Sequence, residues 1–286
     1  MRPTLSTIAA TVARYVVVIT LAALMLATQA FGAARRPGRV RAETWSAAFT
    51  LQPGQNQSSS GPCPRRAPVS LSPVLYANSN APDGDIALTG FGLYGARGSY
   101  TAVRDLGQAP VRVVAGVLCS DLKVRRVART AIVAAAGETV LAFSCPRSAP
   151  QPVSGFAGPN TTAGDGQLLV TRSLPAGRTW RIGLANVSGQ PLPAHAGAEC
   201  ASRTHTIVRV HDVDVVQPGR GASLGEPCPK RAPQAIGGFF GPGSASAAGQ
   251  IALAESYAYK RRTWATTVRG LGATPEPYEA GAICVS

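Results

Sequence analysis

The chain has 286 residues and a net charge of +14, with 28 Lys and Arg against 14 Asp and Glu. Aromatic residues make up only 6% of the sequence, whereas Gly and Pro number 31 and 23. This composition is typical of short strands joined by many turns. Because no aromatic residues are interleaved with the basic clusters, nucleic acid is not an expected partner.

Residues 1–34 have the features of an export signal. Arg2 and Arg14 precede an uncharged apolar run from Tyr15 to Ala27, and Thr28-Gln-Ala30 offers small residues for cleavage. This order is that of a secretory signal peptide. The alternative is a retained membrane anchor, since residues 15–34 carry no charge and are long enough to cross a bilayer as a helix. Both alternatives place the rest of the chain outside the cytoplasm.

After a basic linker, residues 35–42, the sequence repeats three times. Cys63-Pro-Arg-Arg-Ala-Pro68 returns as Cys145-Pro-Arg-Ser-Ala-Pro150 and as Cys228-Pro-Lys-Arg-Ala-Pro233. A second cysteine follows each motif after 55 or 56 residues. We therefore expect three modules, residues 43–121, 122–202 and 203–286. The repeat leaves two arrangements open, independent modules in a row or one body with approximate threefold symmetry.

The six cysteines are expected to form one disulfide within each module, because equivalent modules should close equivalent bridges. The expected pairs are Cys63–Cys119, Cys145–Cys200 and Cys228–Cys284. Cys119–Cys145 and Cys200–Cys228 would also be short, but they would tie neighbouring modules together. Each expected bridge closes a loop worth about 4 kcal/mol in the chain-entropy model. An even number of cysteines without a Cys-x-x-Cys pair indicates an oxidising compartment rather than a redox or zinc site.

Each module is expected to contain about six short antiparallel strands. The first strand ends at a turn, Leu51-Gln-Pro-Gly54, Ala135-Ala-Gly137 or Val216-Gln-Pro-Gly219, whose glycine suits a type II turn. Later in the module, large apolar residues alternate in Trp180-Arg-Ile-Gly-Leu184, and a similar alternation leads to each second cysteine. Period-two patterning indicates half-buried strands. The sequence thus predicts an all-β fold of three tandem, disulfide-stapled, antiparallel β-sandwich-like modules after an N-terminal signal or anchor helix.

The motifs Cys-Pro, Ile236-Gly-Gly-Phe239, Trp264 and Ala282-Ile-Cys284 together resemble a repeat of exported actinobacterial proteins. The second module keeps this pattern, whereas the first has Pro73-Val74 for the glycine pair and Ser99-Tyr100 for the tryptophan. Most proteins with this repeat have no assigned function. The resemblance implies an extracytoplasmic β-module and no catalytic residues.

Residues suited to catalysis or metal binding are few. The histidines His195, His205 and His211 do not recur at equivalent positions, and no Gly-x-Ser-x-Gly motif lies between a strand and a helix. An unrecognised hydrolase site stays an alternative. His211-Asp-Val-Asp214 and the loop with Asn78, Asn80, Asp83 and Asp85 could supply oxygen ligands, but a polar strand face and a turn explain them better. We expect no catalytic residue, metal or cofactor.

Two kinds of binding site are considered. Trp180, Trp264 and Phe239-Phe240 could stack on sugars; alternation favours a core position for the tryptophans, and Phe240 is the better exposed candidate. The basic residues after each Cys-Pro could bind an anionic polymer, namely Arg65, Arg66, Arg147, Lys230 and Arg231. We therefore expect a non-enzymatic, secreted or cell-surface interaction protein. The alternative is a binding module for an anionic cell-envelope polymer or glycan, with membrane contact only through residues 15–34 if these are not cleaved.

Overall fold

The structure is a computed structural model that describes residues 40–77, 85–94, 98–160, 165–243, 249–260 and 262–286. The N-terminal signal or anchor segment lies outside the described residues. The described part is all-β, with six strands in each module and no helix. The strands of the first module are β1 (Ala42–Leu51), β2 (Asn56–Pro62), β3 (Val69–Ala77), β4 (Ile86–Tyr94), β5 (Gly98–Asp105) and β6 (Val111–Ser120).

The other two modules repeat this order of strands. Those of the second are β7 (Val124–Val133), β8 (Glu138–Ser144), β9 (Gln151–Pro159), β10 (Leu168–Ala176), β11 (Thr179–Asn186) and β12 (Leu192–Ala201). Those of the third are β13 (Ile207–Val216), β14 (Gly221–Pro227), β15 (Gln234–Pro242), β16 (Ile251–Lys260), β17 (Thr263–Gly270) and β18 (Glu276–Val285).

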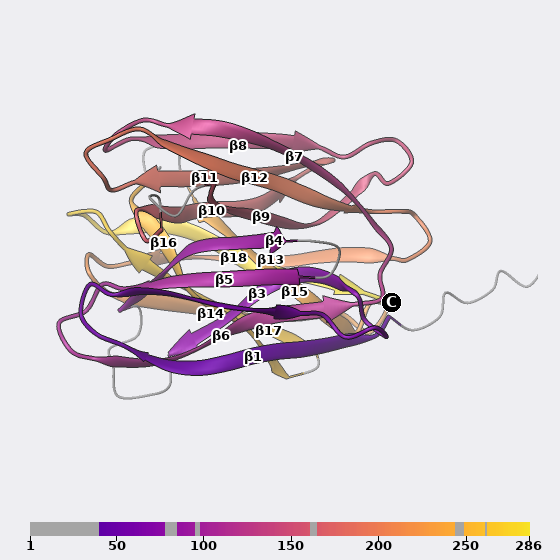
Figure 1. The fold of residues 1–286 in the computed structure, drawn as a ribbon. Helices are drawn as coiled ribbons and strands as arrows, with labels where there is room; N and C mark the ends of the chain where they lie inside the picture. The colour runs from indigo at the N-terminus through magenta and orange to yellow at the C-terminus, as the bar shows by residue number, and fades with distance from the viewer. Residues whose placement is uncertain (1–39, 78–84, 95–97, 161–164, 244–248, 261) are drawn as a thin grey trace, which may run out of the picture. The chain divides into compact units, whose positions relative to one another are not determined.

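The strands form three six-stranded sheets, and each sheet combines strands of two modules (Figure 1). Sheet A has the order β1-β6-β3-β16-β17-β14, sheet B β2-β5-β4-β9-β12-β7, and sheet C β13-β18-β15-β10-β11-β8. In each module the first, sixth and third strands therefore lie in one sheet and the second, fifth and fourth strands in another. Of the two arrangements that the repeat left open, the structure has the closed one, in which all three modules form one compact unit.

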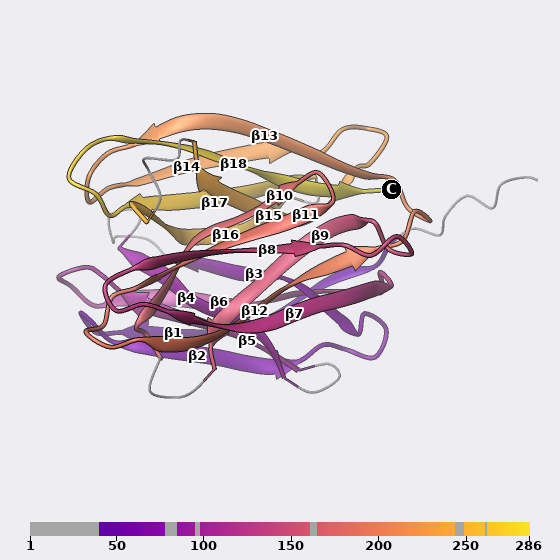
Figure 2. The same ribbon diagram turned by 90° about the horizontal axis from the view of Figure 1, so that it is seen from above.

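The modules meet at three short joints. In each joint the third strand of one module pairs antiparallel with the fourth strand of another, at Ser256↔Leu75, Ser173↔Phe240 and Phe91↔Ala157. The fourth strands β4, β10 and β16 also contact one another pairwise. One continuous hydrophobic cluster contains buried residues of all three modules. Figure 2 shows the same three sheets from a second direction.

The three disulfides have the expected pairing, Cys63–Cys119, Cys145–Cys200 and Cys228–Cys284. Within a module, the first cysteine directly follows the second strand and the other lies on the sixth strand, which belongs to the other sheet. The bridges therefore connect sheets A and B, B and C, and C and A. Because all strand pairing along and between modules is antiparallel, the three bridges lie at one end of the strands, near the C-terminus in Figures 1 and 2. We call it the disulfide end.

The tryptophans occupy equivalent core positions, as the alternation predicted. Trp180 and Trp264 are 1% and 0% exposed, and each donates its indole N–H to a serine of the adjacent strand, Ser173 at 3.0 Å and Ser256 at 2.9 Å. Their rings cover Gly155 and Gly238, where any Cβ would collide with the indole. In the first module Phe91 replaces the serine and Ser99 replaces the tryptophan, so the aromatic ring moves to the neighbouring strand.

The turn after the first strand places a left-handed residue nine positions before the first cysteine of every module. This residue is Gly54 (φ 74°), Ala136 (φ 49°) or Gly219 (φ 65°). The second module thus differs from expectation, because Gly137 follows the strained position instead of occupying it. The hydrogen bond from Gly137 N to Ala134 O shows the reason, since it makes Ala136 the third residue of the turn. A left-handed alanine costs roughly 1–2 kcal/mol.

We expect Ala136→Gly to raise the free energy of unfolding by about 0.5–1 kcal/mol, because relief of the left-handed strain exceeds the added backbone entropy of glycine. Chemical denaturation of both proteins measures this difference. The matched control is Ala135→Gly in the same turn, which adds only the entropy and should stabilise nothing. Equal effects of the two substitutions would contradict the strain at Ala136.

We further expect residues 203–286, produced alone under oxidising conditions, to lack a cooperative unfolding transition. Separation from the other modules leaves β15 without β10 and β16 without β3, and exposes Phe239 and Phe240, which are 4% and 1% exposed in the whole protein. Thermal denaturation followed by circular dichroism compares the fragment with residues 40–286. A sharp transition of the fragment would show that a module closes its own core.

Candidate functional site

The five predicted basic residues lie on three equivalent turns at the disulfide end. In each turn the alanine N–H bonds to the carbonyl of the proline after the cysteine, as in Ala67 N to Pro64 O at 3.0 Å. The cysteine before the turn and the alanine at its end are buried. The two residues between the hydrogen-bonded proline and alanine are exposed in every module. Accordingly, all five predicted side chains are exposed, namely Arg65, Arg66, Arg147, Lys230 and Arg231.

One of the five has an acidic partner. Arg66 Nε lies 2.6 Å from Glu43 Oε1, with 68% of the arginine side chain exposed. Exposed pairs of this kind contribute little to stability. No ion pair joins Arg65, Arg147, Lys230 or Arg231 to an acid within the described residues.

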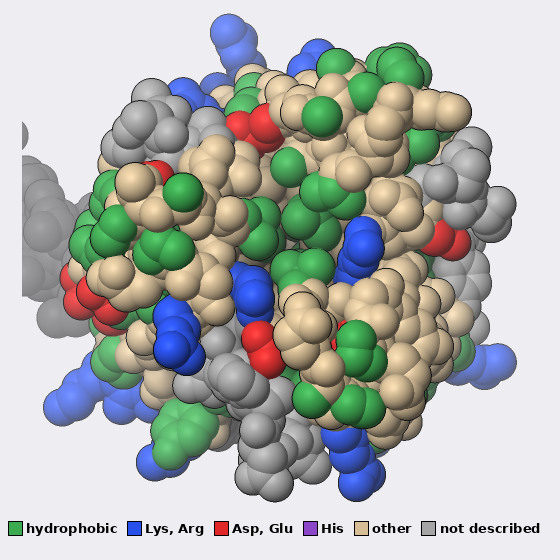
Figure 3. All heavy atoms as spheres, turned by 90° about the vertical axis from the view of Figure 1, so that its left-hand side faces the viewer, with side chains coloured by type: hydrophobic (Ala, Val, Ile, Leu, Met, Phe, Trp, Pro, Cys, Tyr) green, Lys and Arg blue, Asp and Glu red, His purple; other side chains and the backbone are tan. Residues whose placement is uncertain are grey.

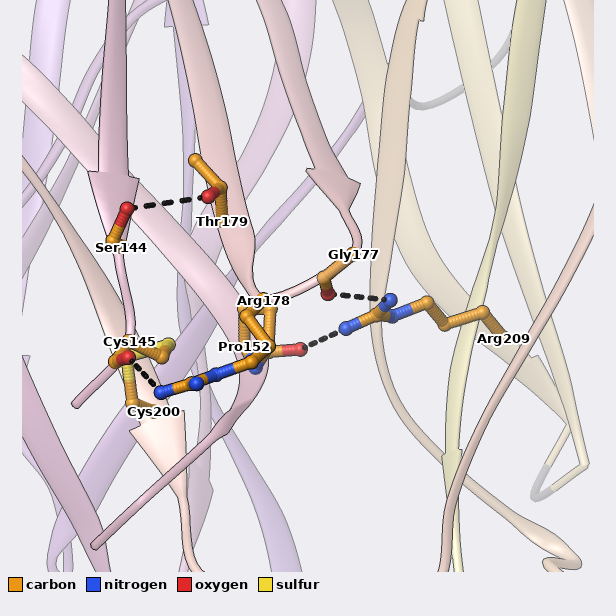
Figure 4. The surroundings of a disulfide bond; sticks show 8 residues. All are labelled: Ser144, Cys145, Pro152, Gly177, Arg178, Thr179, Cys200 and Arg209. Carbon is orange, nitrogen blue, oxygen red and sulfur yellow. Dashed lines mark hydrogen bonds between the residues drawn. A yellow bond between two sulfur atoms is a disulfide. The ribbon is translucent and has the colours of Figure 1, made fainter. Parts of the chain in front are cut away.

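Two further arginines lie at this end and were not among the five basic residues predicted from the sequence. Arg178 Nη2 donates to the carbonyl of Cys145 at 2.8 Å, and Arg262 Nη2 donates to the carbonyl of Cys228 at 2.7 Å. The hairpin that carries each of them therefore lies beside the cysteine that precedes a basic turn. Figure 4 shows this contact for Arg178 and Cys145. The repeated tripeptide Arg-Thr-Trp, at 178–180 and 262–264, was the available signal.

The described segments between strands differ in charge at the two ends of the strands. The segments between strands at the disulfide end also carry Lys123 and Arg203, and the acid among their described residues is Asp121. At the opposite end the corresponding described segments carry Asp85 and Asp165, with Arg220 as their basic residue. Figure 3 shows this opposite end, where hydrophobic side chains gather near the centre with Lys and Arg side chains beside them. Cations from all three modules thus share one end.

The second and third modules are held together at the disulfide end by Arg209 of β13. Its guanidinium donates to Gly177 O at 3.1 Å and to Pro152 O at 3.2 Å (Figure 4). Burial lowers the pKa of Arg209. A groove of about 400 Å³ lies beside it and is bordered by Arg231. Arg209 thereby links β13 of the third module to β9 and to the β10–β11 turn of the second.

The acidic groups considered as metal ligands have structural partners. Asp85 Oδ1 accepts from Arg269 Nη1 at 2.7 Å, an ion pair between the first and third modules. Asn78, Asn80 and Asp83 of the same loop lie outside the described residues. On edge strand β13, Asp212 and Asp214 each accept from the backbone N–H of the following residue. Among the described residues, no group of three or more Cys, His, Asp or Glu could hold a metal ion.

The structure contradicts one prediction about the aromatic residues. Phe240 is only 1% exposed, so the prediction of an exposed Phe240 was wrong. Phe240 lies where β15 pairs with β10 of the second module, and this pairing covers its side chain. The alternation of residues within one module does not indicate a pairing between modules. The most exposed aromatic side chain of the described residues is that of Tyr259, at 60%. Tyr259 and Tyr257 of β16 line the same groove. The close spacing of the two tyrosines in the sequence was the available signal.

A buried acid on β12 of sheet B has a strongly shifted pKa. Glu199 of β12 is 1% exposed, and its Oε1 accepts from Arg126 Nε at 2.9 Å. The other oxygen, Oε2, is buried without a hydrogen-bond partner. Burial raises the pKa of the Glu199 carboxyl to about 7, although the Arg126 guanidinium opposes the rise. The equivalent residues of the other modules are Leu118 and Ile283, so the acid replaces a core aliphatic residue.

Comparison with protein-family models gives no match for this chain, and comparison with curated protein sequences gives none either. The resemblance to an actinobacterial repeat thus stays a prediction. The disulfides indicate an oxidising environment outside the cytoplasm. None of the described residues belongs to a helix long and apolar enough to cross a membrane.

We expect Glu199 to make stability fall as pH rises from about 4.5 to about 7. Over this interval the native carboxyl keeps a proton that the unfolded chain has released, so ionisation favours unfolding. Glu199→Gln should remove this part of the pH dependence and stabilise the protein at pH 8 by about 1–3 kcal/mol. Denaturation at pH 5 and pH 8 measures both effects. The control is Glu276→Gln, on a less buried acid; an unchanged pH profile in Glu199→Gln would contradict the assignment.

Proposed function

We propose that this protein is an exported, non-enzymatic binding protein whose disulfide end binds an anionic polymer of the cell envelope. The observation that carries this proposal is the gathering of exposed cations from all three modules at one end of the strands. Residues 1–34 would direct export, either as a cleaved signal or as a retained anchor. The disulfides fit the same compartment.

The rigidity of the basic turns supports this function. Each turn lies next to a disulfide and ends at a buried alanine, so its two outward side chains start from a fixed backbone. Arg178 and Arg262 hold the neighbouring hairpins against the cysteine carbonyls. A preorganised surface loses less entropy on binding than a flexible one.

The arrangement of the modules favours a polymeric ligand. A single exposed cation attracts an anion weakly in water. Three modules in fixed geometry present their cations together, so that repeated anionic groups of one polymer could engage several turns, and the second contact gains from effective concentration. Binding of this kind weakens with salt, since the screening length is about 10 Å at 0.1 M. Nucleic acid is not proposed, because the compartment does not suit it.

We expect the triple variant Arg65→Ser, Arg147→Ser and Lys230→Ser, one change in each module, to bind heparin or teichoic acid at least about tenfold more weakly at low salt. Affinity chromatography with a salt gradient measures the loss. These three side chains are exposed, so the fold should be unaffected.

The matched control is Arg112→Ser, Arg129→Ser and Arg220→Ser, which also takes one exposed arginine from each module but none from the basic turns. Both variants lower the net charge equally. The control should elute close to the wild-type position. Equal losses in the two variants would show that only total charge matters and would refute a site at the disulfide end.

A further inference from the structure

A solvent-facing groove of about 410 Å³ lies across sheet A at the joint between the first and third modules. Strands β1, β3 and β16 line it. On β1, Thr44 and Ser46 are exposed on the face opposite Trp45, whose ring covers Gly61 on the inner side. Because the groove spans the β3–β16 pairing, it exists only when the two modules are joined.

Three tyrosines form the groove's aromatic surface. The rings of Tyr76 and Tyr257 contact each other with centroids 5.3 Å apart and planes tilted by 53°. Tyr259 is 60% exposed, and Lys260 Nζ lies 5.1 Å from the centre of its ring. Tyrosine supplies a large, rigid contact area at a small cost in conformational entropy and a hydroxyl for hydrogen bonding.

A carboxylate is fixed at the base of the same groove. Glu255 is 9% exposed, and it accepts from the backbone N–H of Ala77 at 2.9 Å and from Thr267 Oγ1 at 2.9 Å. The first of these bonds crosses the joint between the modules. Glu255 thus holds β3 against β16, and the tyrosines of the two strands keep a fixed separation.

The tyrosines depart from the approximate symmetry of the fold. The positions of Tyr76 in the other modules hold Gly158 and Gly241. At these glycines the protein fills the space itself, since a Cβ on Gly158 would meet the Tyr100 hydroxyl and a Cβ on Gly241 would meet the Leu174 side chain. The Tyr76–Tyr257 pair is therefore particular to one of the three joints, where both rings pack against the hydrophobic core and keep part of their surface exposed.

We propose that the tyrosine groove of sheet A binds neutral sugar units of an extracellular polysaccharide. A pyranose ring offers apolar C–H faces to the tyrosine rings, and its hydroxyls can bond to the hydroxyls of Thr44, Ser46 and the tyrosines. The groove volume of about 410 Å³ lies within the range of small-molecule sites. This binding does not depend on the basic turns, so the inference goes beyond the proposed function.

The test uses the full chain and four neutral oligosaccharides, the hexamers of glucose, mannose, galactose and N-acetylglucosamine. Calorimetric titration in 0.5 M NaCl suppresses contacts that depend on charge. We expect saturable binding of at least one hexamer. Tyr257→Ala and Tyr259→Ala should each weaken it at least about tenfold, which is the size of effect that a central aromatic contact gives.

Ile132→Ala is the matched control, because Ile132 is 62% exposed on β7 of sheet B and its truncation also removes exposed apolar surface. It should bind sugar like the wild type, as should the triple variant of the basic turns. Absence of binding for all four hexamers would overturn the proposal, and so would wild-type affinity in both tyrosine variants. Loss of polyanion binding with retained sugar binding would separate this site from the disulfide end.

Discussion

The division of every module between two sheets is the constraint on which this structure depends. A sheet is completed only when the third strand of one module pairs with the fourth strand of another, as β3 pairs with β16. Neither half of a module has a complete sheet of its own. The three joints consequently make the core continuous, and residues such as Phe240 are buried by strands from outside their own module.

The disulfides act on this interlocked arrangement at one end. Within a module each bridge is local, but it connects two different sheets, so three local bridges link all three sheets in a cycle. The turn after each first cysteine lies beside a bridge and is pinned at its alanine. The same covalent framework therefore supports the fold and presents the cations of the proposed polymer site.

The places where the modules differ are as informative as those where they agree. Core residues such as Trp180 and Trp264 recur because equivalent positions in the modules have the same packing environment. The Tyr76–Tyr257 pair occurs at one joint only, since the position of Tyr76 holds glycine in the other two modules. Glu199 replaces an aliphatic core residue and leaves an unpaired buried oxygen.

The sequence by itself determined the all-β class, the three equivalent modules, the disulfide pairing and the inward positions of Trp180 and Trp264. These depend on local periodicity and on spacing within a module, which a single repeat contains in full. Only the tertiary structure decided which strands share a sheet, since β3, β9 and β15 each have one partner in another module. The alternation of a strand is the same whichever strand pairs with it. For this reason the burial of Phe240, the common end of the basic turns and the meeting of Tyr76 with Tyr257 could not be read from the sequence. The left-handed Ala136 belongs with them, because the turn's hydrogen bond, and not the nearest glycine, set its position.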